Sequence, residues 1–230
     1  MLPHGRLERV GERMLTVEGR IKMPLVDLPR RMTVVRLRDG RLVVWSAIAL
    51  DAPAMATLDA FGRPAFLVVP NDHHRLDARA WKQRYPDLVV VAPEGARGKV
   101  ADVVPVDSTE PDFDDPDVTF VTVPGTRGHE AALVVRAASG TTLVLNDLVG
   151  NMRAASGIDG WLLRVAGFAG DQAQVPRVVR LALVKDAADV RAQLLEWAEL
   201  PSLERILVSH GDPLDRDPRR TLRELASTLA

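Results

Sequence analysis

Four of the five histidines and one isolated aspartate stand soon after short apolar segments of this 230-residue chain. Side chains that follow the strands of a layered α/β protein can converge in one cleft, because the strands fix their backbone positions. The chain has no cysteine, so a metal in such a cleft would be held by imidazole and carboxylate groups, which suit zinc, iron or manganese. We therefore predict a metal site with an open coordination position, built from His73, His74, His129, Asp147 and His210.

Each of these residues, taken alone, also fits a structural role. Adjacent residues rarely face the same point, so at most one of His73 and His74 need be a ligand. The pair Asn146-Asp147 also suits side chain to backbone hydrogen bonding in a turn, and His210 in SHGD suits a glycine turn. The grouping of these residues, rather than any one of them, favours the site.

The elements that must position these side chains alternate between strand and helix. Asp39-Gly40 predicts a tight hairpin turn between two β-branched runs, and Asp51 marks the start of a helix that Gly62 ends. The continuous apolar run AFLVVP predicts a buried strand. The segments expected in the first half are a hairpin at 33–48, a helix at 51–62, a strand at 65–70, a helix at 76–85 and a strand at 88–92.

The second half repeats this order. A strand at 119–125 precedes a hairpin at 131–147 about Ser139-Gly140, whose second strand ends in Asn146-Asp147. The segment 150–200 is mostly helical, with an amphipathic stretch at 175–184 and a helix from Asp186 that places Val190, Leu194 and Trp197 on one face. A strand at 204–213 and a helix at 221–229 follow, and the acidic, proline-rich segment 107–117 is predicted to be a solvated loop. The alternation predicts one layered α/β domain over 1–230, with 1–12 as a flexible N-terminal arm.

The composition limits the classes of partner. The chain is 47% hydrophobic, and its 30 basic and 31 acidic side chains leave a net charge of -1. Without a strong overall field, neither nucleic acid nor an anionic membrane is the expected partner, and a small-molecule substrate fits better. The N-terminus has no apolar signal core and no apolar run approaches the ~20 residues of a membrane span, so we expect a cytoplasmic protein. The oligomeric state stays open, with a homodimer as one option.

The order of motifs resembles the metallo-β-lactamase fold, a four-layer αββα sandwich with a metal site at the edge where strand ends meet. PNDHHRL resembles the T-H-x-H-x-D-H signature, VPGTRGHEAALVV the P-G-H-T-x-G-H segment, TTLVLNDLVG the L-x-T-G-D-L strand, and ILVSHGDP the closing G-H-G turn. The resemblance covers roughly residues 13 to 230. It implies that His73, or His74 after a one-residue shift, binds metal together with His129, Asp147 and His210.

The first motif departs from the family pattern at three positions. Asn71 occupies the first histidine position, Arg75 the aspartate position and Leu76 the last histidine position. These departures remove usual ligands and favour one metal over two, or none if the site is degenerate. Within the fold, the chain is similar to a bacterial branch labelled DUF4336, on the segment from DLVGN through GWLLRVAGF and on VPRVVRLALVKD and VSHGDPL.

We infer a metal-dependent hydrolase of an ester, thioester, lactone or phosphoester, in which the metal, zinc in preference to iron or manganese, activates a water. Asp72 or Asp77 would serve as base, and Asn71 and Arg75 would contact the substrate, although an outward orientation of Arg75 is favoured. The alternative is a non-catalytic binding or interaction protein that kept the scaffold and lost the metal. A lid over 151–174 is a further option. A Rossmann nucleotide binder and a serine hydrolase are disfavoured, because G-x-G-x-x-G and G-x-S-x-G are absent.

Overall fold

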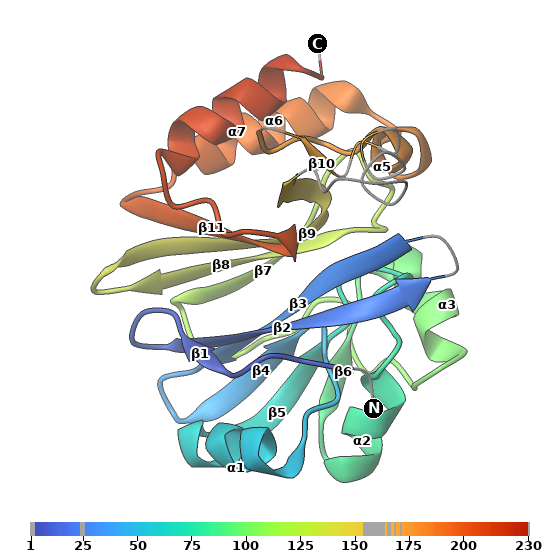
Figure 1. The fold of residues 1–230 in the computed structure, drawn as a ribbon, viewed down its shortest axis with the longest axis vertical. Helices are drawn as coiled ribbons and strands as arrows, with labels where there is room; N and C mark the ends of the chain where they lie inside the picture. Colours follow the sequence, from blue (N-terminus) through green and yellow to red (C-terminus); the bar gives the residue numbers. More distant parts are fainter. Residues whose placement is uncertain are drawn as a thin grey trace.

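Two β-sheets lie face to face, with helices on the outer side of each (Figure 1). This computed structural model describes residues 3–23, 26–153, 164, 167, 169–170 and 172–229. The first sheet has the order β1 (Glu8–Arg9), β2 (Met14–Met23), β3 (Val26–Arg36), β4 (Arg41–Trp45), β5 (Arg63–Val68) and β6 (Val89–Val91). In the second sheet β9 (Gly140–Arg153) pairs with three strands, β8 (Ala131–Ala137), β10 (Ala169–Gly170) and β11 (Leu203–Gly211), and β7 (Val118–Thr122) pairs with β8.

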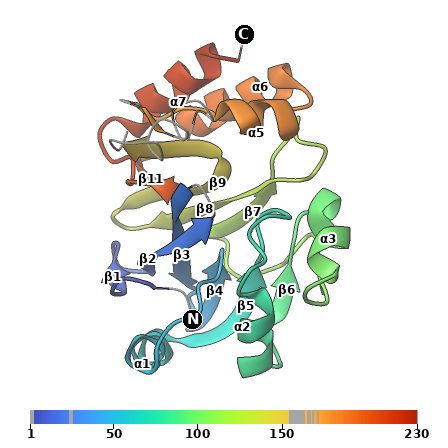
Figure 2. The ribbon, with the colours of Figure 1, turned by 45° about the vertical axis from the view of Figure 1, so that its right-hand side comes forward.

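Three apolar layers hold this arrangement together. α1 (Ala52–Phe61), α2 (Ala78–Arg84), a 3-10 turn (Glu94–Ala96) and α3 (Arg97–Ala101) belong to the first half of the chain, and α5 (Arg177–Ala182), α6 (Ala187–Ala198) and α7 (Pro218–Ser227) to the second (Figure 2). Leu58 and Trp81 pack from α1 and α2 against the first sheet, and Leu194 and Leu222 from α6 and α7 against the second. Between the sheets lies a third core, with members that include Val43, Val68, Leu133 and Leu207. The predicted four-layer αββα sandwich is confirmed.

The hairpin turn and helix starts predicted from local sequence are present in the structure. β3 and β4 form the predicted hairpin in antiparallel register, and Gly40 in its turn has a φ of 85°. Asp51 caps α1, because its side chain accepts a hydrogen bond from the Ala54 N–H, and Asp186 caps α6 in the same way. α7 begins at Pro218, earlier than predicted, because the Asp217 carboxylate accepts from the Arg220 N–H and so starts the helix there.

The prediction that a strand ends at Asn146-Asp147 is wrong. β9 continues to Arg153, and its register against β11 shifts in the middle: Val208 pairs with Leu145, but His210 pairs with Gly150. β9 therefore has extra residues between these two pairs, which form a bulge that contains Asp147. The lid predicted at 151–174 lies for the most part outside the described residues.

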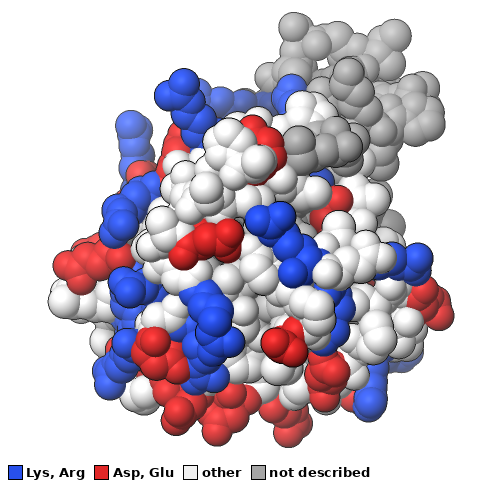
Figure 3. Space-filling model, turned by 90° about the horizontal axis from the view of Figure 1, so that it is seen from below, with Lys and Arg blue, Asp and Glu red and all other residues white. Residues whose placement is uncertain are grey.

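Residues at the N-terminus run beside the first sheet. His4 forms an isolated bridge with Gly19, and β1 pairs with β2. On the face that Figure 3 shows, basic and acidic side chains are interspersed, and neither sign gathers into one large patch. Among the described residues, no helix has both the length and the apolar character needed to cross a membrane.

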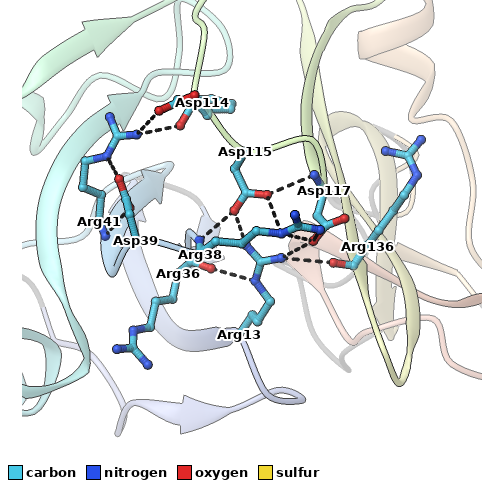
Figure 4. A network of polar contacts seen from close by, with 10 residues as sticks. Arg13, Arg36, Arg38, Asp39, Arg41, Asp114, Asp115, Asp117 and Arg136 are labelled. Carbon is cyan, nitrogen blue, oxygen red and sulfur yellow. Dashed lines mark hydrogen bonds and ion pairs between the residues drawn. The ribbon is translucent and has the colours of Figure 1, made fainter.

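An ion-pair network ties the two halves together at the end of the sandwich where the β3–β4 hairpin lies (Figure 4). The Asp115 carboxylate, almost completely buried, pairs with Arg13 and accepts hydrogen bonds from the Arg38 and Asp117 N–H groups. Arg13 also pairs with Asp117 and donates to the Arg136 carbonyl oxygen. The segment 107–117 is therefore not simply a solvated loop, because Asp115 anchors it to the first sheet.

We expect Asp115→Asn to lower the free energy of unfolding by about 1–3 kcal/mol at pH 7, because it removes a buried, charge-assisted interaction. Burial alone would raise the pKa of Asp115, but hydrogen bonds from the Arg38 and Asp117 N–H groups and from Arg13 outweigh burial and lower it. A carboxyl group with a lowered pKa stabilises the fold above its unfolded value of about 3.9, and this contribution disappears as the pH falls through the folded value.

The difference in stability between wild type and Asp115→Asn should thus be constant from pH 7 to about 5 and shrink at lower pH. Urea denaturation across this range measures it. Asp114→Asn is the matched control, because the Asp114 side chain is 92% exposed. A difference that stays the same or grows below pH 4 would contradict the assigned role of the carboxylate.

Candidate functional site

Three predicted ligands meet at one point. His74 Nε2 lies 3.0 Å and His210 Nε2 lies 2.9 Å from the same Asp147 oxygen, Oδ1, and the two Nε2 atoms are 3.3 Å apart. All three side chains are nearly inaccessible to solvent. Among the described residues this is the group whose ligand atoms lie close enough together to hold a metal ion.

Local backbone geometry brings the three side chains together. His74 lies in the loop after β5, Asp147 in the bulge of β9, and His210 near the end of β11. Gly211 then turns the chain with a φ of 106°, and a Cβ on it would lie 2.1 Å from the Asn151 carbonyl oxygen. Only glycine fits this position, so the SHGD sequence supplies both the ligand and the turn that follows it.

Hydrogen bonds on the far side of each ring fix its orientation. His210 Nδ1 lies 2.7 Å from the Pro29 carbonyl oxygen in β3, and His74 Nδ1 lies 2.6 Å from Ser46 Oγ directly after β4. Ser46 has a φ of 53°, a conformation that non-glycine residues rarely adopt and that is often found at functional sites. Each ring therefore presents Nε2 to Asp147, as expected for histidines that bind metal.

The contact between His210 and Asp147 requires a cation. A carbonyl oxygen only accepts hydrogen bonds, so His210 Nδ1 carries the hydrogen that it shares with Pro29. In a neutral ring the Nε2 lone pair would then face a carboxylate oxygen at 2.9 Å, and the two would repel. Either a proton on Nε2 or a metal ion relieves this repulsion. Burial lowers the pKa of His210, but the hydrogen bond and charge of Asp147 outweigh burial and raise it.

The donor set fits a divalent metal. Around a metal with bonds of about 2.0–2.2 Å, neighbouring ligand atoms in an octahedral or tetrahedral shell lie about 2.8–3.6 Å apart. The three separations here, 2.9, 3.0 and 3.3 Å, agree with that range. Two imidazoles and one carboxylate leave positions open for water or substrate, as in catalytic zinc sites and in non-haem iron sites. A metal would replace the proton on the histidine pair.

Asn71 holds the carboxylate from behind. Its Nδ2 donates to Asp147 Oδ2 at 2.6 Å and to Glu130 Oε2 at 3.0 Å. Its Oδ1 accepts hydrogen bonds from the N–H groups of His73 and His74. The amide thus fixes both the Asp147 carboxylate and the loop that carries His74. Asn71 also lines the cavity, so its predicted contact with substrate stays a prediction.

Glu130 is a second buried carboxyl group beside Asp147. Burial, followed by the negative charge of Asp147, raises the pKa of Glu130 well above its usual value. For Asp147, burial opposes ionisation, but the charges and hydrogen bonds of His74 and His210 lower its pKa well below the usual value. Of the two carboxyl groups, Glu130 therefore binds a proton more readily and Asp147 ionises more readily, with its Oδ1 directed at the histidines.

The other predicted ligands lie outside this group. His73 has a side chain that is 76% exposed and lies 3.3 Å from Asp72 Oδ1, so the structure brings His74 rather than His73 to the centre. His129 lines the same cavity but does not belong to the three-ligand group. The one-residue shift considered for the first motif is therefore the arrangement that the fold adopts.

The two predicted bases differ in position. Asp72 lines the cavity, and Lys99 Nζ lies 2.7 Å from its Oδ2. Burial would raise the pKa of Asp72, but Lys99 and the neighbouring histidines outweigh burial and lower it. Asp77 instead pairs with Arg30. Arg75 donates to the Lys99 carbonyl oxygen and lies near Asp102, and neither Asp77 nor Arg75 is among the residues that line the cavity.

A cavity of about 770 Å³ opens over the three ligands. Its walls combine apolar side chains from β2, β3, α5 and the loop after β5 with basic side chains from β3, α3, the loop after β7 and the segment after α5. The residues that line it include Ile21, Leu28, Arg30, Leu76, Lys99, Arg127, His129, Val178, Val179, Leu183 and Lys185.

Sequence reasoning missed three supporting groups. Ser46 and the Pro29 carbonyl orient the rings across sequence separations of 28 and 181 residues, and no local pattern signals such contacts. Glu130 did carry a signal, because it is an acidic residue between His129 and the apolar strand 131–135. An acidic side chain at the edge of a buried strand needs a partner, and here the partners are Asn71 and the Leu148 N–H.

The same fold occurs in solved metallo-β-lactamases. DIM-1 metallo-β-lactamase exposed to ceftazidime matches with a TM-score of 0.65 at 13% identity over 100% of both chains. FIM-1 from Pseudomonas aeruginosa in its mono-zinc form matches with a TM-score of 0.61 at 12% identity, over 99% of this chain and 96% of that one. The enzyme from Erythrobacter litoralis, with β-mercaptoethanol in its active site, matches at 0.65 and 12% over 96% of each chain.

No model of a known protein family and no curated protein matches the sequence. The structural matches, at these identities, show the fold alone. The chain therefore has the metallo-β-lactamase fold, with a His-Asp-His group that can hold a metal at the edge of its sheets. The narrower resemblance to the DUF4336 branch stays a prediction.

We expect the purified protein to bind about one equivalent of zinc, because the described residues bring together one three-ligand group. His74→Ala and His210→Ala should each reduce bound zinc to below about a tenth of an equivalent. His73→Ala and His129→Ala should retain it, since neither residue belongs to that group. Elemental analysis after dialysis against zinc measures the metal content.

Circular dichroism on each variant shows whether the fold is intact, so that metal loss is not a result of unfolding. Loss of zinc in His73→Ala together with retention in His74→Ala would show that the loop after β5 binds metal in another arrangement.

Proposed function

We propose that this protein is a single-metal hydrolase that cleaves an ester, thioester, lactone or phosphoester of a small molecule. The observation that carries the proposal is the convergence of His74 Nε2, His210 Nε2 and Asp147 Oδ1 within 3.3 Å of one another at the floor of a cavity. A buried group of this kind, with both rings fixed by outer hydrogen bonds and with space above it, suits catalysis better than a structural role.

The ligand set favours one metal. Asn71 occupies a histidine position of the resembled motif and is engaged with Asp147 and Glu130, while Leu76 supplies no donor at all. FIM-1, which has the same fold, has been seen in a mono-zinc form. We favour zinc, and iron or manganese would suit the same two imidazoles and carboxylate.

A bound divalent metal lowers the pKa of water toward neutrality and polarises an acyl or phosphoryl oxygen. In the net reaction, the hydroxyl part of water joins the acyl carbon or phosphorus, the bond to the leaving oxygen or sulfur breaks, and the remaining proton goes to the leaving group. Asp72 is the residue that we place as proton acceptor, because it lines the cavity and its lowered pKa keeps it ionised at neutral pH. Lys99, which pairs with Asp72, would hold that carboxylate in place.

Asp77 is not needed in this scheme. Its carboxylate pairs with Arg30, and this interaction supports the wall of the cavity and not its floor. The non-catalytic alternative, a scaffold that has lost its metal, is decided by the metal content of the protein and by its activity.

We expect the zinc-loaded protein to hydrolyse at least one member of a panel of chromogenic esters, thioesters, lactones and phosphodiesters. Asp147→Asn should abolish the activity together with the bound zinc. Asp72→Asn should keep the zinc and lower kcat by about 10²–10⁴-fold, the usual contribution of a positioned acid or base. Initial rates at saturating substrate measure the effect.

Asp87→Asn is the matched control, because Asp87 is exposed and lies away from the cavity. Full activity in Asp72→Asn would remove Asp72 from the mechanism. A protein that binds zinc but cleaves no member of the panel, and that also lacks measurable affinity for them, would favour the non-catalytic alternative.

A further inference from the structure

We propose that the cavity above the His-Asp-His group binds a substrate with two parts, an apolar chain and an anionic group, and that Arg127 and Lys185 bind the anionic group. That this molecule is cleaved rests on the proposed function, but its binding does not. The inference depends on the distribution of apolar and basic side chains around the cavity, away from the three ligands.

The lining of the cavity includes large apolar side chains that are exposed to solvent. The described residues include four large hydrophobic side chains that are exposed, and two of them, Leu76 at 53% and Val178 at 43%, line this cavity. Leu28 from β3 and Val179 from α5 also line the cavity. Exposed apolar side chains in a cavity beside a reactive centre are typical of a site that binds an apolar group.

The basic side chains of the cavity divide into two classes. Arg30 is neutralised by Asp77, and Lys99 by Asp72. Arg127 and Lys185, both exposed, have no hydrogen bond or ion pair to their side chains among the described residues. The cavity therefore retains two uncompensated positive charges, and an anionic group of a ligand is the partner that would neutralise them.

Backbone hydrogen bonds place these two cations on adjacent segments. Gly125 accepts hydrogen bonds from the N–H groups of Lys185 and Asp186, so the loop that carries Arg127 is joined to the segment that carries Lys185. On its other side, Gly95 donates its N–H to Gly128 at 2.8 Å. The loop after β7 is thus held from both sides, although no hydrogen bond or ion pair with the described part of the chain holds the Arg127 side chain.

The backbone of this loop is also constrained. Arg127 has a φ of 51° and Gly128 one of 72°, and a Cβ on Gly95 would lie 2.5 Å from the Arg127 carbonyl oxygen. A non-glycine residue in the left-handed region costs about 1 kcal/mol or more and often marks a ligand-binding position. The chain tolerates this conformation at a residue that lines the cavity, and the guanidinium there can bind a carboxylate or phosphate through two parallel hydrogen bonds.

The size of the cavity agrees with such a ligand. A volume of about 770 Å³ falls in the range of ~300–1,000 Å³ typical of sites for small molecules. It accommodates a medium-length chain along α5 together with a carboxylate or phosphate near Arg127. We infer as the substrate class an ester, thioester or lactone that carries, besides the reacting group, an apolar chain and a separate free carboxylate or phosphate.

Binding to the zinc-loaded protein tests the inference without any turnover. Isothermal titration calorimetry would compare octanoate, octyl phosphate and 1-octanol, and then hexanoate with decanoate. We expect both octyl anions to bind at least tenfold more tightly than octanol, and the carboxylates to gain about two- to fourfold in affinity per added methylene. The ratio of octanoate to octyl phosphate shows which anion the site prefers.

The variants separate the two parts of the ligand. The double variant Arg127→Gln with Lys185→Gln should weaken octanoate binding at least tenfold and leave octanol binding unchanged. Leu76→Ser with Val178→Ser should reduce the gain per methylene. Arg191→Gln is the control for the loss of an exposed guanidinium, because Arg191 is exposed on α6 and does not line the cavity.

Equal octanoate binding in wild type and in the double variant would overturn the inference, since the zinc would then be binding the carboxylate alone. Octanol binding as tight as octanoate, or no binding of any probe, would overturn it as well. If the probes bind as expected but no ester is cleaved, the proposed hydrolysis fails and the binding inference stands. If short neutral esters are the best substrates, the proposed hydrolysis stands and the binding inference fails.

Discussion

The carboxylate of Asp147 is the constraint on which the rest of this site depends. It is buried and ionised, and a buried charge is stable only where opposite charge and hydrogen bonds surround it. One of its oxygens is occupied by the Asn71 amide, and the other lies within 3.0 Å of two imidazole nitrogens. Since the Pro29 carbonyl determines which nitrogen of His210 carries hydrogen, the only stable occupant between ring and carboxylate is a proton or a metal ion. The remainder of the fold maintains this geometry.

Two features of the scaffold make that placement possible. The bulge in β9 moves Asp147 out of regular strand register and toward His210, at the point where β9 and β11 change their pairing. Next to it, burial and the negative charge of Asp147 raise the pKa of Glu130 well above its usual value, which disfavours a second negative charge in the interior. At the far end of the sandwich, Asp115 and Arg13 join the sheets through a second buried ion pair. The sheets are therefore fixed relative to each other at both ends, which a site assembled from both of them requires.

The sequence was informative wherever local chemistry decided the structure. Turns at Asp39-Gly40, caps at Asp51 and Asp186, and apolar runs such as AFLVVP predicted the elements and their order, and the motif order predicted the layers. It was less informative where long-range packing decided. His73 and His74 lie in a loop that the Asn71 side chain fixes. In a strand, successive side chains point to opposite faces, but this rule does not apply to a loop. The sequence therefore could not show which of the two histidines faces the centre. The end predicted for the strand at Asp147 was wrong for a similar reason: a bulge interrupts the pairing, but the chain on both sides of it stays extended.

The departures from the resembled motif can be explained together. An amide at position 71 cannot replace an imidazole as a metal ligand, but it can donate to two carboxyl groups at once, and Asn71 does so. In the proposed function, this exchange of a ligand for a support favours one metal over two. Leucine at position 76 removes another donor, and its side chain instead adds apolar surface to the wall of the cavity. The same short stretch that limits the number of metals thus changes what the cavity can bind. A site with one metal provides less positive charge to a substrate than a site with two, so an anionic substrate needs cations from the protein. Arg127 and Lys185 are placed where they can supply them.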